Sequence, residues 1–271
     1  MASEVTNRPP ETFLETNFST SWPAVVAPFI IPNAPKTFFY VPDFIDAETE
    51  AELLQNIYAS GKWQYLAHRR LQIWGGAPHP KGMIAEKIPD WLHSLMDRIS
   101  DFGVFGPYRA NHVLINEYKP GEGIMPHHDG PLYYPVVTTV NLGGHSMLDF
   151  YYPITDDMTD VSFKSRYVGS ALLMPRSMNM VTDSLYTYYM HGIEEKKVDY
   201  LHLIKNDFDS SSFFADPDSE IEKKILNLSQ IPQWEDLADQ LERKTRISIT
   251  IRHVPKTRKV NLSRLFKGTF S

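Results

Sequence analysis

Hydrophobic residues follow two different periods along this chain. Over residues 43–60, Leu53, Leu54 and Ile57 are spaced for one apolar stripe of a helix, and Asp46 is placed to cap its start. Residues 89–102 repeat the helical spacing, with Pro89 near the start, where proline is tolerated. Two helices are therefore predicted in the first part of the chain.

From about residue 108 the pattern changes to short β-rich runs with turn signals between them. These runs are residues 111–118, 135–143, 146–153, 166–175, 185–193, 198–204 and 245–254. Many short strands at this spacing are typical of a sandwich or a small barrel. We expect a mostly β, α+β fold whose core covers residues 108–255, with helices and loops of residues 36–107 packed outside it.

The remaining segments carry weaker signals. Residues 1–35 have scattered prolines and no sustained period, so we expect an extended arm. Residues 69–83 have the glycines and prolines of a loop or short hairpin. Within a 194–243 insertion, residues 207–222 hold six acids and no base, which predicts a mobile loop, and residues 234–244 predict a short helix. Residues 256–271 form a basic tail.

Composition excludes several classes of site and protein. The chain has no cysteine, so disulfides, zinc–thiolate sites, iron–sulfur clusters and thiol nucleophiles are absent, and any metal needs nitrogen and oxygen ligands. A net charge of -6 argues against coating duplex DNA by bulk electrostatics, but it allows a local basic groove. Residues 1–11 lack the features of a signal peptide, and the apolar run 22–32 is too short and proline-rich to span a bilayer. We expect a monomer in the cytoplasm and nucleus that does not associate with membranes.

The stretch "PHHDG" carries the first candidate chemistry. Side chains two residues apart share one face of a strand, so His127 and Asp129 can point the same way while His128 points away. An imidazole and a carboxylate side by side, with one further ligand, form the facial triad that binds Fe(II) and leaves adjacent positions open. By itself the pair is a weak signal, and a surface turn is the more common explanation.

Three other patterns use the same even spacing. In "TRISITIR", three isoleucines form one face and Arg246, Ser248, Thr250 and Arg252 form the other. Two arginines on one face favour a dicarboxylate ligand, the alternative being a solvated surface. In "NHVLINEY", Asn116 and Tyr118 share a face and can hydrogen-bond a carboxylate. His191, at the end of an aromatic run, could supply the third metal ligand, although a lone histidine there is more often structural.

In this order these residues resemble the AlkB family of Fe(II)/2-oxoglutarate-dependent dioxygenases. The resemblance covers about residues 40–255, and "RRLQIWGG" and "HHDGPLYYPVVTTVNLGGHSMLDFY" are similar to the eukaryotic AlkB homologue 6 branch. It implies a double-stranded β-helix (jelly-roll) core, with Fe(II), 2-oxoglutarate and O2. The implied iron ligands, which are also the catalytic residues, are His127, Asp129 and His191. The implied 2-oxoglutarate ligands are Asn116, Tyr118, Arg246, Ser248 and Arg252.

The chain departs from the family pattern at three places. Ser248 stands where many members have asparagine, Gly130-Pro131 follow the metal aspartate where several members have acids, and about 50 residues separate His191 from the arginine strand. In the family the loops before the core form a nucleotide-recognition lid. In the matching region we expect His68, Arg69 and Arg70 to contact phosphates and Trp74 to stack, with Tyr133 lining the pocket. Simple packing is the alternative for Trp74 and Tyr133.

The leading functional hypothesis is oxidative demethylation of an N-alkylated base in RNA or DNA, with release of succinate, CO2 and formaldehyde. Such a base must be single-stranded or extruded to reach the iron. One alternative keeps the enzyme class but takes a protein or lipid substrate, in line with the acidic net charge. Another is a nucleic-acid-binding module with little catalytic activity. The sequence names neither the alkyl group nor the base.

Overall fold

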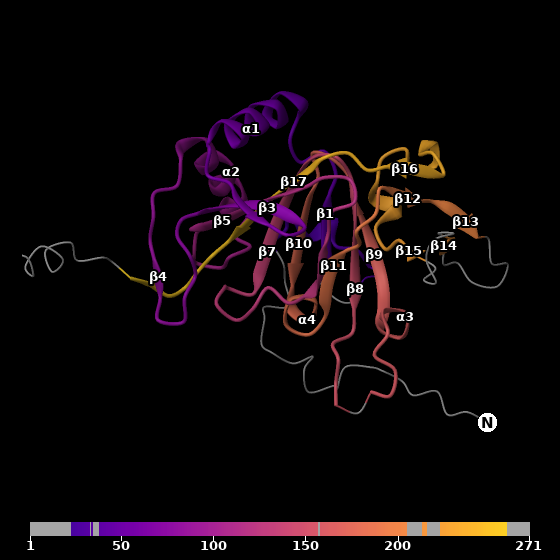
Figure 1. Cartoon of the computed structure of the whole chain (residues 1–271). Coiled ribbons are helices and arrows are strands. Elements are labelled where there is room, and N and C mark those ends of the chain that lie inside the picture. Colours follow the sequence, from indigo (N-terminus) through magenta and orange to yellow (C-terminus); the bar gives the residue numbers. More distant parts are fainter. Residues whose placement is uncertain are drawn as a thin grey trace, which may run out of the picture.

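Two antiparallel sheets form the centre of the computed structural model, which describes residues 23–32, 34, 38–156, 158–204, 213–215 and 223–258 (Figure 1). The larger sheet has the strand order β1 (Phe38–Val41), β10 (Met178–Thr182), β7 (Val136–Gly143), β17 (Arg246–Arg252), β5 (His112–Tyr118), β3 (Arg69–Trp74) and β2 (Gln64–Leu66). The smaller sheet has the order β6 (Ile124–His127), β11 (Met190–Ile193), β8 (Ser146–Tyr151) and β9 (Tyr167–Leu173). This is the mostly β architecture expected of a double-stranded β-helix.

Two apolar clusters lie on the two faces of the larger sheet. One joins its outer face to helices α1 (Ala47–Ala59) and α2 (Asp90–Asp101), which cover it as seen in Figure 1. The other fills the space between the two sheets and includes Phe38, Val137, Phe150 and Leu172. Both faces of the central strands of the larger sheet are therefore buried, which agrees with the full burial of β17, whereas the edge strand β2 is exposed.

Strand β17 shows how the alternating pattern is used. Ile247, Ile249 and Ile251 are at most 1% exposed and pack in the cluster under the helices. The intervening polar side chains, Arg246, Ser248, Thr250 and Arg252, line a cavity on the opposite face. The same strand thus contributes to the apolar core on one side and to a polar cavity on the other.

Both predicted helices are confirmed. Asp46 caps α1 by accepting a 2.8 Å hydrogen bond from the Thr49 backbone N–H, and Leu53 and Ile57 are buried. Helix α2 begins directly after Pro89. The predicted hairpin over residues 69–83 is in part a strand, because β3 pairs with β2 on one side and with β5 on the other.

Two predicted elements are wrong. Residues 234–244 do not form a helix: a 3-10 turn, η4 (Trp234–Asp236), is followed by strand β16 (Gln240–Glu242), which pairs with β12 (Val198–Tyr200). Long-range pairing overrides the local helical preference there. The run 185–193 is a strand only from Met190, since helix α4 (Asp183–Thr187) precedes β11.

Smaller elements complete the described chain. They are η2 (Ala27–Phe29), α3 (Phe163–Arg166), β13 (His202–Ile204), β14 (Phe213–Ala215), β15 (Lys223–Lys224), η3 (Leu228–Gln230), and β18 (Thr257–Arg258), which pairs in parallel with β4 (Met83–Ile84). The expected acidic loop at 207–222 contains β14, and its other positions lie outside the described residues. So do residues 1–22 of the expected arm and residues 259–271 of the basic tail. No helix within the described ranges is long and apolar enough to cross a membrane.

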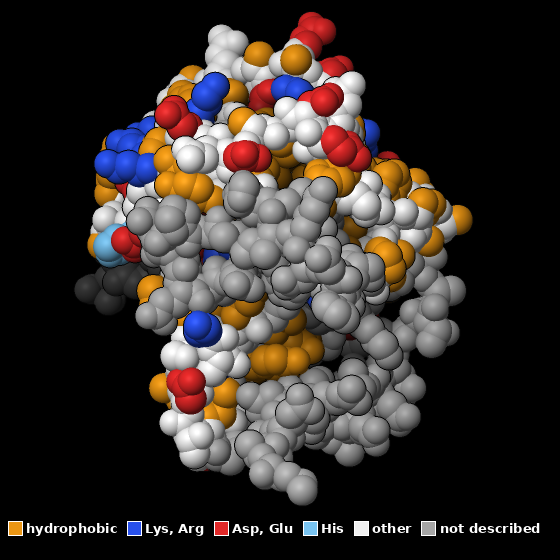
Figure 2. Space-filling view, turned by 90° about the vertical axis from the view of Figure 1, so that its right-hand side faces the viewer, with side chains coloured by type: hydrophobic (Ala, Val, Ile, Leu, Met, Phe, Trp, Pro, Cys, Tyr) orange, Lys and Arg blue, Asp and Glu red, His pale blue; other side chains and the backbone are white. Residues whose placement is uncertain are grey.

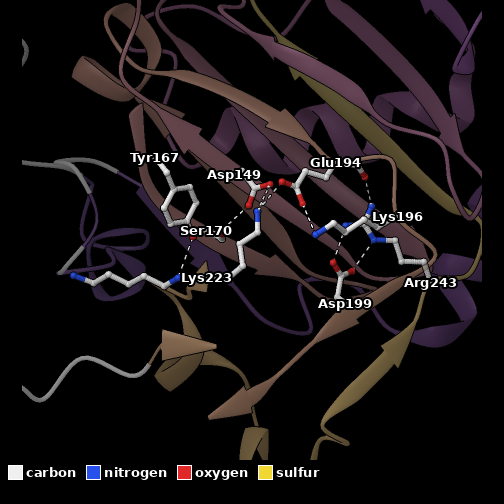
Figure 3. Close-up of polar contacts among 9 residues, drawn as sticks. Asp149, Tyr167, Ser170, Glu194, Lys196, Asp199, Lys223 and Arg243 are labelled. Carbon is white, nitrogen blue, oxygen red and sulfur yellow. Dashed lines mark hydrogen bonds and ion pairs between the residues drawn. The ribbon is translucent and has the colours of Figure 1, made fainter. Parts of the chain in front are cut away.

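Buried ion pairs fasten the segment after β11 to the smaller sheet (Figure 3). The Lys223 ammonium lies 2.9 Å from Asp149 on β8 and 3.2 Å from Glu194. Arg243 holds Asp199 through two hydrogen bonds of 2.6 and 2.7 Å. Viewed from the side, the upper part of the molecule shows charged side chains of both signs, and hydrophobic side chains are exposed lower down (Figure 2).

Candidate active site

A cavity of about 580 Å³ opens between the two sheets. Its wall includes every residue predicted to bind the metal or 2-oxoglutarate, namely His127, Asp129, His191, Asn116, Tyr118, Arg246, Ser248 and Arg252. These residues come from strands β5, β6, β11 and β17 and from the turn after β6. The structure therefore gathers the whole predicted set around one space.

The two histidines are brought together by strand pairing. His127 on β6 and His191 on β11 are cross-strand partners, and their ring centroids are 4.7 Å apart. The register shifts directly after His191, an irregularity that re-aims side chains. Gly192 permits the close approach of the strands, because a Cβ there would lie 2.9 Å from the Ile124 carbonyl oxygen and from the Pro126 nitrogen.

Both imidazoles are suited to hold a metal. His127 Nδ1 lies 2.9 Å from the Met125 carbonyl oxygen and donates to it, which leaves Nε2 with a free lone pair. His191 Nε2 lies 3.7 Å from Asp129 Oδ2. Burial lowers the pKa of His191 to about 4, although the Asp129 carboxylate opposes the shift, so this ring is neutral at neutral pH. Neutral imidazole is the form that ligates metals.

Asp129 supplies an ionised carboxylate. Its burial alone would raise the pKa of Asp129, but the Arg252 guanidinium and the two imidazoles outweigh burial and lower it. Arg252 Nη2 donates to Asp129 Oδ1. One carboxylate and two imidazoles are the donor set that suits Fe(II). As positioned, no three His, Asp or Glu side chains among the described residues lie close enough together to hold an ion.

Arg246 provides an anion site in the same cavity. It is 3% exposed, and its Nη2 donates to Asn141 Oδ1 at 2.6 Å. Its Nε and Nη1 are buried without a hydrogen-bond partner. Burial lowers the pKa of Arg246 to about 10, so the group stays protonated at neutral pH. A buried cation with unused donors favours a carboxylate ligand, as the dicarboxylate 2-oxoglutarate would provide.

Two asparagines that sequence reasoning missed complete this part of the cavity. Asn141 on β7 orients Arg246 and is itself held by Asn179 on β10, at 3.2 Å, and by Ser177. Asn179 lines the cavity. Asn141 lies two residues after Thr139, which lines the cavity, so both side chains point to the same face of β7. Polar residues at these alternate positions of β7 were the signal in the sequence that could have identified Asn141.

The predicted lid residues are divided between the cavity and the opposite face. His68 and Arg69 line the cavity, with His68 Nδ1 3.2 Å from Glu195 and Arg69 Nε donating to Asn116 at 3.1 Å. Arg70 does not line it. Its guanidinium is bound to Glu117 at 2.7 and 2.8 Å, and the phosphate contact expected of Arg70 stays a prediction.

Trp74 and Tyr133 are held by packing. The indole of Trp74 packs edge-on against Trp91, 6.0 Å between centroids, and donates to Gln72 at 3.1 Å. It therefore lies under the helices rather than at the cavity, and the stacking role predicted for it is corrected. The Arg252 guanidinium carbon lies over the Tyr133 ring, 4.5 Å from the ring centroid, so this ring packs against the arginine side chain.

His128 is turned away from the cavity, as predicted. Its Nε2 lies 2.9 Å from the Tyr188 carbonyl oxygen, and it is absent from the cavity wall. The next residue but one, Gly130, has φ of +87° and accepts a 2.5 Å hydrogen bond from the Tyr186 hydroxyl. Because of this turn, the Asp129 side chain lies in the cavity wall and the backbone that follows leads away from the cavity.

Comparison with known proteins gives two informative relatives. The chain is 44% identical over 238 residues to "Probable RNA/DNA demethylase ALKBH6" of Danio rerio, covering 86% of this chain and 92% of that protein. It is 30% identical over 178 residues to protein L905 of Acanthamoeba polyphaga mimivirus, covering 61% and 76%. Among solved structures, OsALKBH1 aligns with a TM-score of 0.48 at 12% identity, covering 80% and 96%. No protein-family model matches the chain.

Proposed function

Because the chain belongs to the AlkB family of Fe(II)/2-oxoglutarate-dependent dioxygenases, in the AlkB homologue 6 branch, we propose that it is an oxidative demethylase of N-alkylated bases in RNA or DNA. The printed name of the Danio rerio relative supports nucleic acid as the substrate class. We also propose that it acts as a monomer in the cytoplasm and nucleus.

The observation that carries the proposal is the arrangement of charge in one cavity. An ionised carboxylate and two imidazoles lie in its wall, and the buried guanidinium of Arg246 lies in the same wall with two unused donors. A purely structural cavity would not keep a buried cation unsatisfied, because desolvating it is costly. A bound dicarboxylate that also reaches a metal would satisfy both groups.

The residues of the chain divide the work of binding. His127, Asp129 and His191 would hold Fe(II), and Arg252 fixes the Asp129 carboxylate through its Nη2. Arg246, with Tyr118 beside it at 5.7 Å, would bind the distal carboxylate of 2-oxoglutarate. When bound, iron and 2-oxoglutarate would activate O2, which is the oxidant: one oxygen atom goes to succinate as 2-oxoglutarate loses CO2, and the other hydroxylates an N-methyl carbon, after which the hemiaminal loses formaldehyde.

The substrate enters by the side of the cavity lined by His68, Arg69 and Glu195. A stacked base cannot reach the histidines, so the base must be single-stranded or extruded. Of the residues first expected in a lid, His68 and Arg69 keep that role in the proposal.

The test measures succinate and methyl loss together. The protein is incubated with Fe(II), 2-oxoglutarate and a panel of single-stranded RNA and DNA oligomers, each carrying one N-methylated base, and a mass spectrometer follows the methyl group. We expect stoichiometric succinate and loss of one methyl, abolished in His127→Ala. Succinate that depends on a protein or lipid extract, with every oligomer unchanged, would select the alternative substrate class. Oligomer binding without succinate would select a binding module.

A further inference from the structure

Three exposed basic side chains gather where the C-terminal strand β18 pairs with β4, at the side of the molecule in Figure 1. They are Lys81, Lys256 and Arg258, and we call them the basic strand surface. Gly82 lets the stems lie close together, because a Cβ at its φ of +112° would be 2.7 Å from Arg258 Cγ and 3.4 Å from Lys256 Cγ. Lys256 Nζ also donates to the Pro80 carbonyl oxygen at 2.7 Å. The stems of Lys256 and Arg258 thus lie beside Gly82, which follows Lys81 directly in the chain.

The charge of this surface is not neutralised by neighbouring acids. Two other cations of the described chain are paired with acids: Lys62 lies 3.3 Å from Glu86, and Arg109 pairs with two aspartates of α2. No described carboxylate forms an ion pair with the three cations of the basic strand surface. The chain as a whole has a net charge of -6, yet residues 252–271 contain no acid. A local positive surface on an acidic protein favours a polyanionic partner.

The basic strand surface is close to the cavity along the chain. Arg252, which contacts Asp129, precedes Arg258 by six residues, and six extended residues span at most about 20 Å. Tyr108, 47% exposed, stacks on His253 between them, with ring centroids 4.6 Å apart. A nucleic-acid strand that places one base in the cavity covers this distance within about six nucleotides, at 3.4 Å per nucleotide.

We propose that the basic strand surface binds the phosphate backbone of the nucleic acid whose modified base enters the cavity. The proposal rests on the demethylase function proposed above, and it adds a positioning contact outside the cavity. Such contacts carry no sequence information, but they fix how the strand lies on the protein. Exposed aromatic groups near cations are typical of surfaces that bind single strands, and Tyr108 stacks on His253, five residues before Arg258.

The experiment measures binding of an unmethylated single-stranded 20-mer, as RNA and as DNA, by fluorescence anisotropy at several salt concentrations. The test variant combines Lys81→Gln, Lys256→Gln and Arg258→Gln. The matched control combines Lys119→Gln, Lys164→Gln and Lys244→Gln, which remove the same charge from exposed positions on other elements. Succinate formation from 2-oxoglutarate alone, together with the thermal midpoint, verifies that both variants keep an intact cavity.

For three phosphate contacts, the slope of log K against log salt should fall in magnitude by about 2, and the affinity at 0.1 M salt should fall by a factor on the order of 100. The control variant should keep the parent slope. If the test and control variants have equal slopes of log K against log salt, the proposal is wrong. It is also wrong if the parent protein binds anionic phospholipid vesicles but neither the RNA nor the DNA oligomer. The binding assay does not depend on loss of a methyl group, so it can be interpreted even if the demethylase assay fails. If demethylation is observed but the salt slope of the test variant is unchanged, only the proposal for the basic strand surface is refuted.

Discussion

Replacing Arg246 by methionine should separate cofactor binding from stability. The guanidinium is 3% exposed and satisfied only through the bond to Asn141, while its Nε and Nη1 have no partner. Removing it leaves the Asn141 oxygen without a donor, a cost of about 1–3 kcal/mol. It also removes the cost of burying an under-satisfied cation, which is several kcal/mol. The protein without ligand should therefore be about as stable as the parent.

Binding of 2-oxoglutarate should respond very differently. Each lost hydrogen bond between charged groups is worth about 1.5–3 kcal/mol, and tenfold in affinity is 1.4 kcal/mol, so KM for 2-oxoglutarate should rise by roughly 10- to 100-fold. In the parent, 2-oxoglutarate at 100 times its Kd should stabilise the fold by about 2.7 kcal/mol. At the same concentration the variant should be stabilised by only about 0.4–1.4 kcal/mol, because the ratio of ligand to Kd falls to between 1 and 10.

The assays are thermal unfolding with and without 2-oxoglutarate, and initial rates of succinate formation. The control is Ser248→Ala on the same face of β17, a hydroxyl for which a smaller effect on KM is expected because no charge is removed. If Arg246→Met unfolds several kcal/mol more easily and yet keeps the stabilisation by 2-oxoglutarate, then Arg246 is a structural residue and the anion site is elsewhere.

Three further outcomes follow from the geometry. His127→Ala should abolish Fe(II) binding measured by metal analysis after gel filtration, whereas His128→Ala should retain it, and the reverse result would exchange their roles. Gly192→Ala should lower the free energy of unfolding by roughly 1–3 kcal/mol and weaken iron binding, since the methyl group meets backbone at 2.9 Å; an unchanged unfolding curve would contradict this. Burial opposes ionisation of Asp199, but its bonds to Arg243 outweigh burial and lower its pKa below 3.8, so this pair stabilises the fold above about pH 4 and the stabilisation is lost on further acidification. The stability difference between the parent and Asp199→Asn should therefore shrink as the pH falls below about 4, and a difference that stays constant would refute the assignment.

Even spacing predicted which residues of β5 and β17 share a face, because successive side chains of a strand point to opposite sides. The resemblance to the AlkB family then implied that Arg246 and Asn116 belong to one site, and both line the cavity. The same rule failed for residues 69–83, which were predicted as a loop or hairpin. Residues 69–74 form strand β3, in which side chains alternate. Arg69 therefore faces the cavity, and Arg70 and Trp74 face the helices. Alternation can be applied only where the strand itself is recognised.

The other errors come from contacts between distant parts of the chain. Strand β16 forms because β12 lies beside it, some forty residues earlier, and nothing within residues 234–244 specifies that partner. Asn141 was missed because its importance depends on Arg246, which reaches it from a neighbouring strand. The local sequence indicates which secondary structures a segment can adopt, and its pairing with a distant strand determines which one forms.

The two faces of β17 also determine how this protein can change over time. An insertion or deletion of one residue within Arg246–Arg252 would exchange the isoleucine face with the arginine face, and both the core and the cavity would be lost together. The two faces should tolerate different substitutions. Ile247, Ile249 and Ile251 should accept only apolar residues of similar volume, and the positions between them should accept only residues of similar charge and polarity. A saturation scan of this strand should show tolerance that alternates with a period of two. New specificity can arise more readily in the connections, such as the turn at Gly130, than in the strand that both folds the protein and binds its ligand.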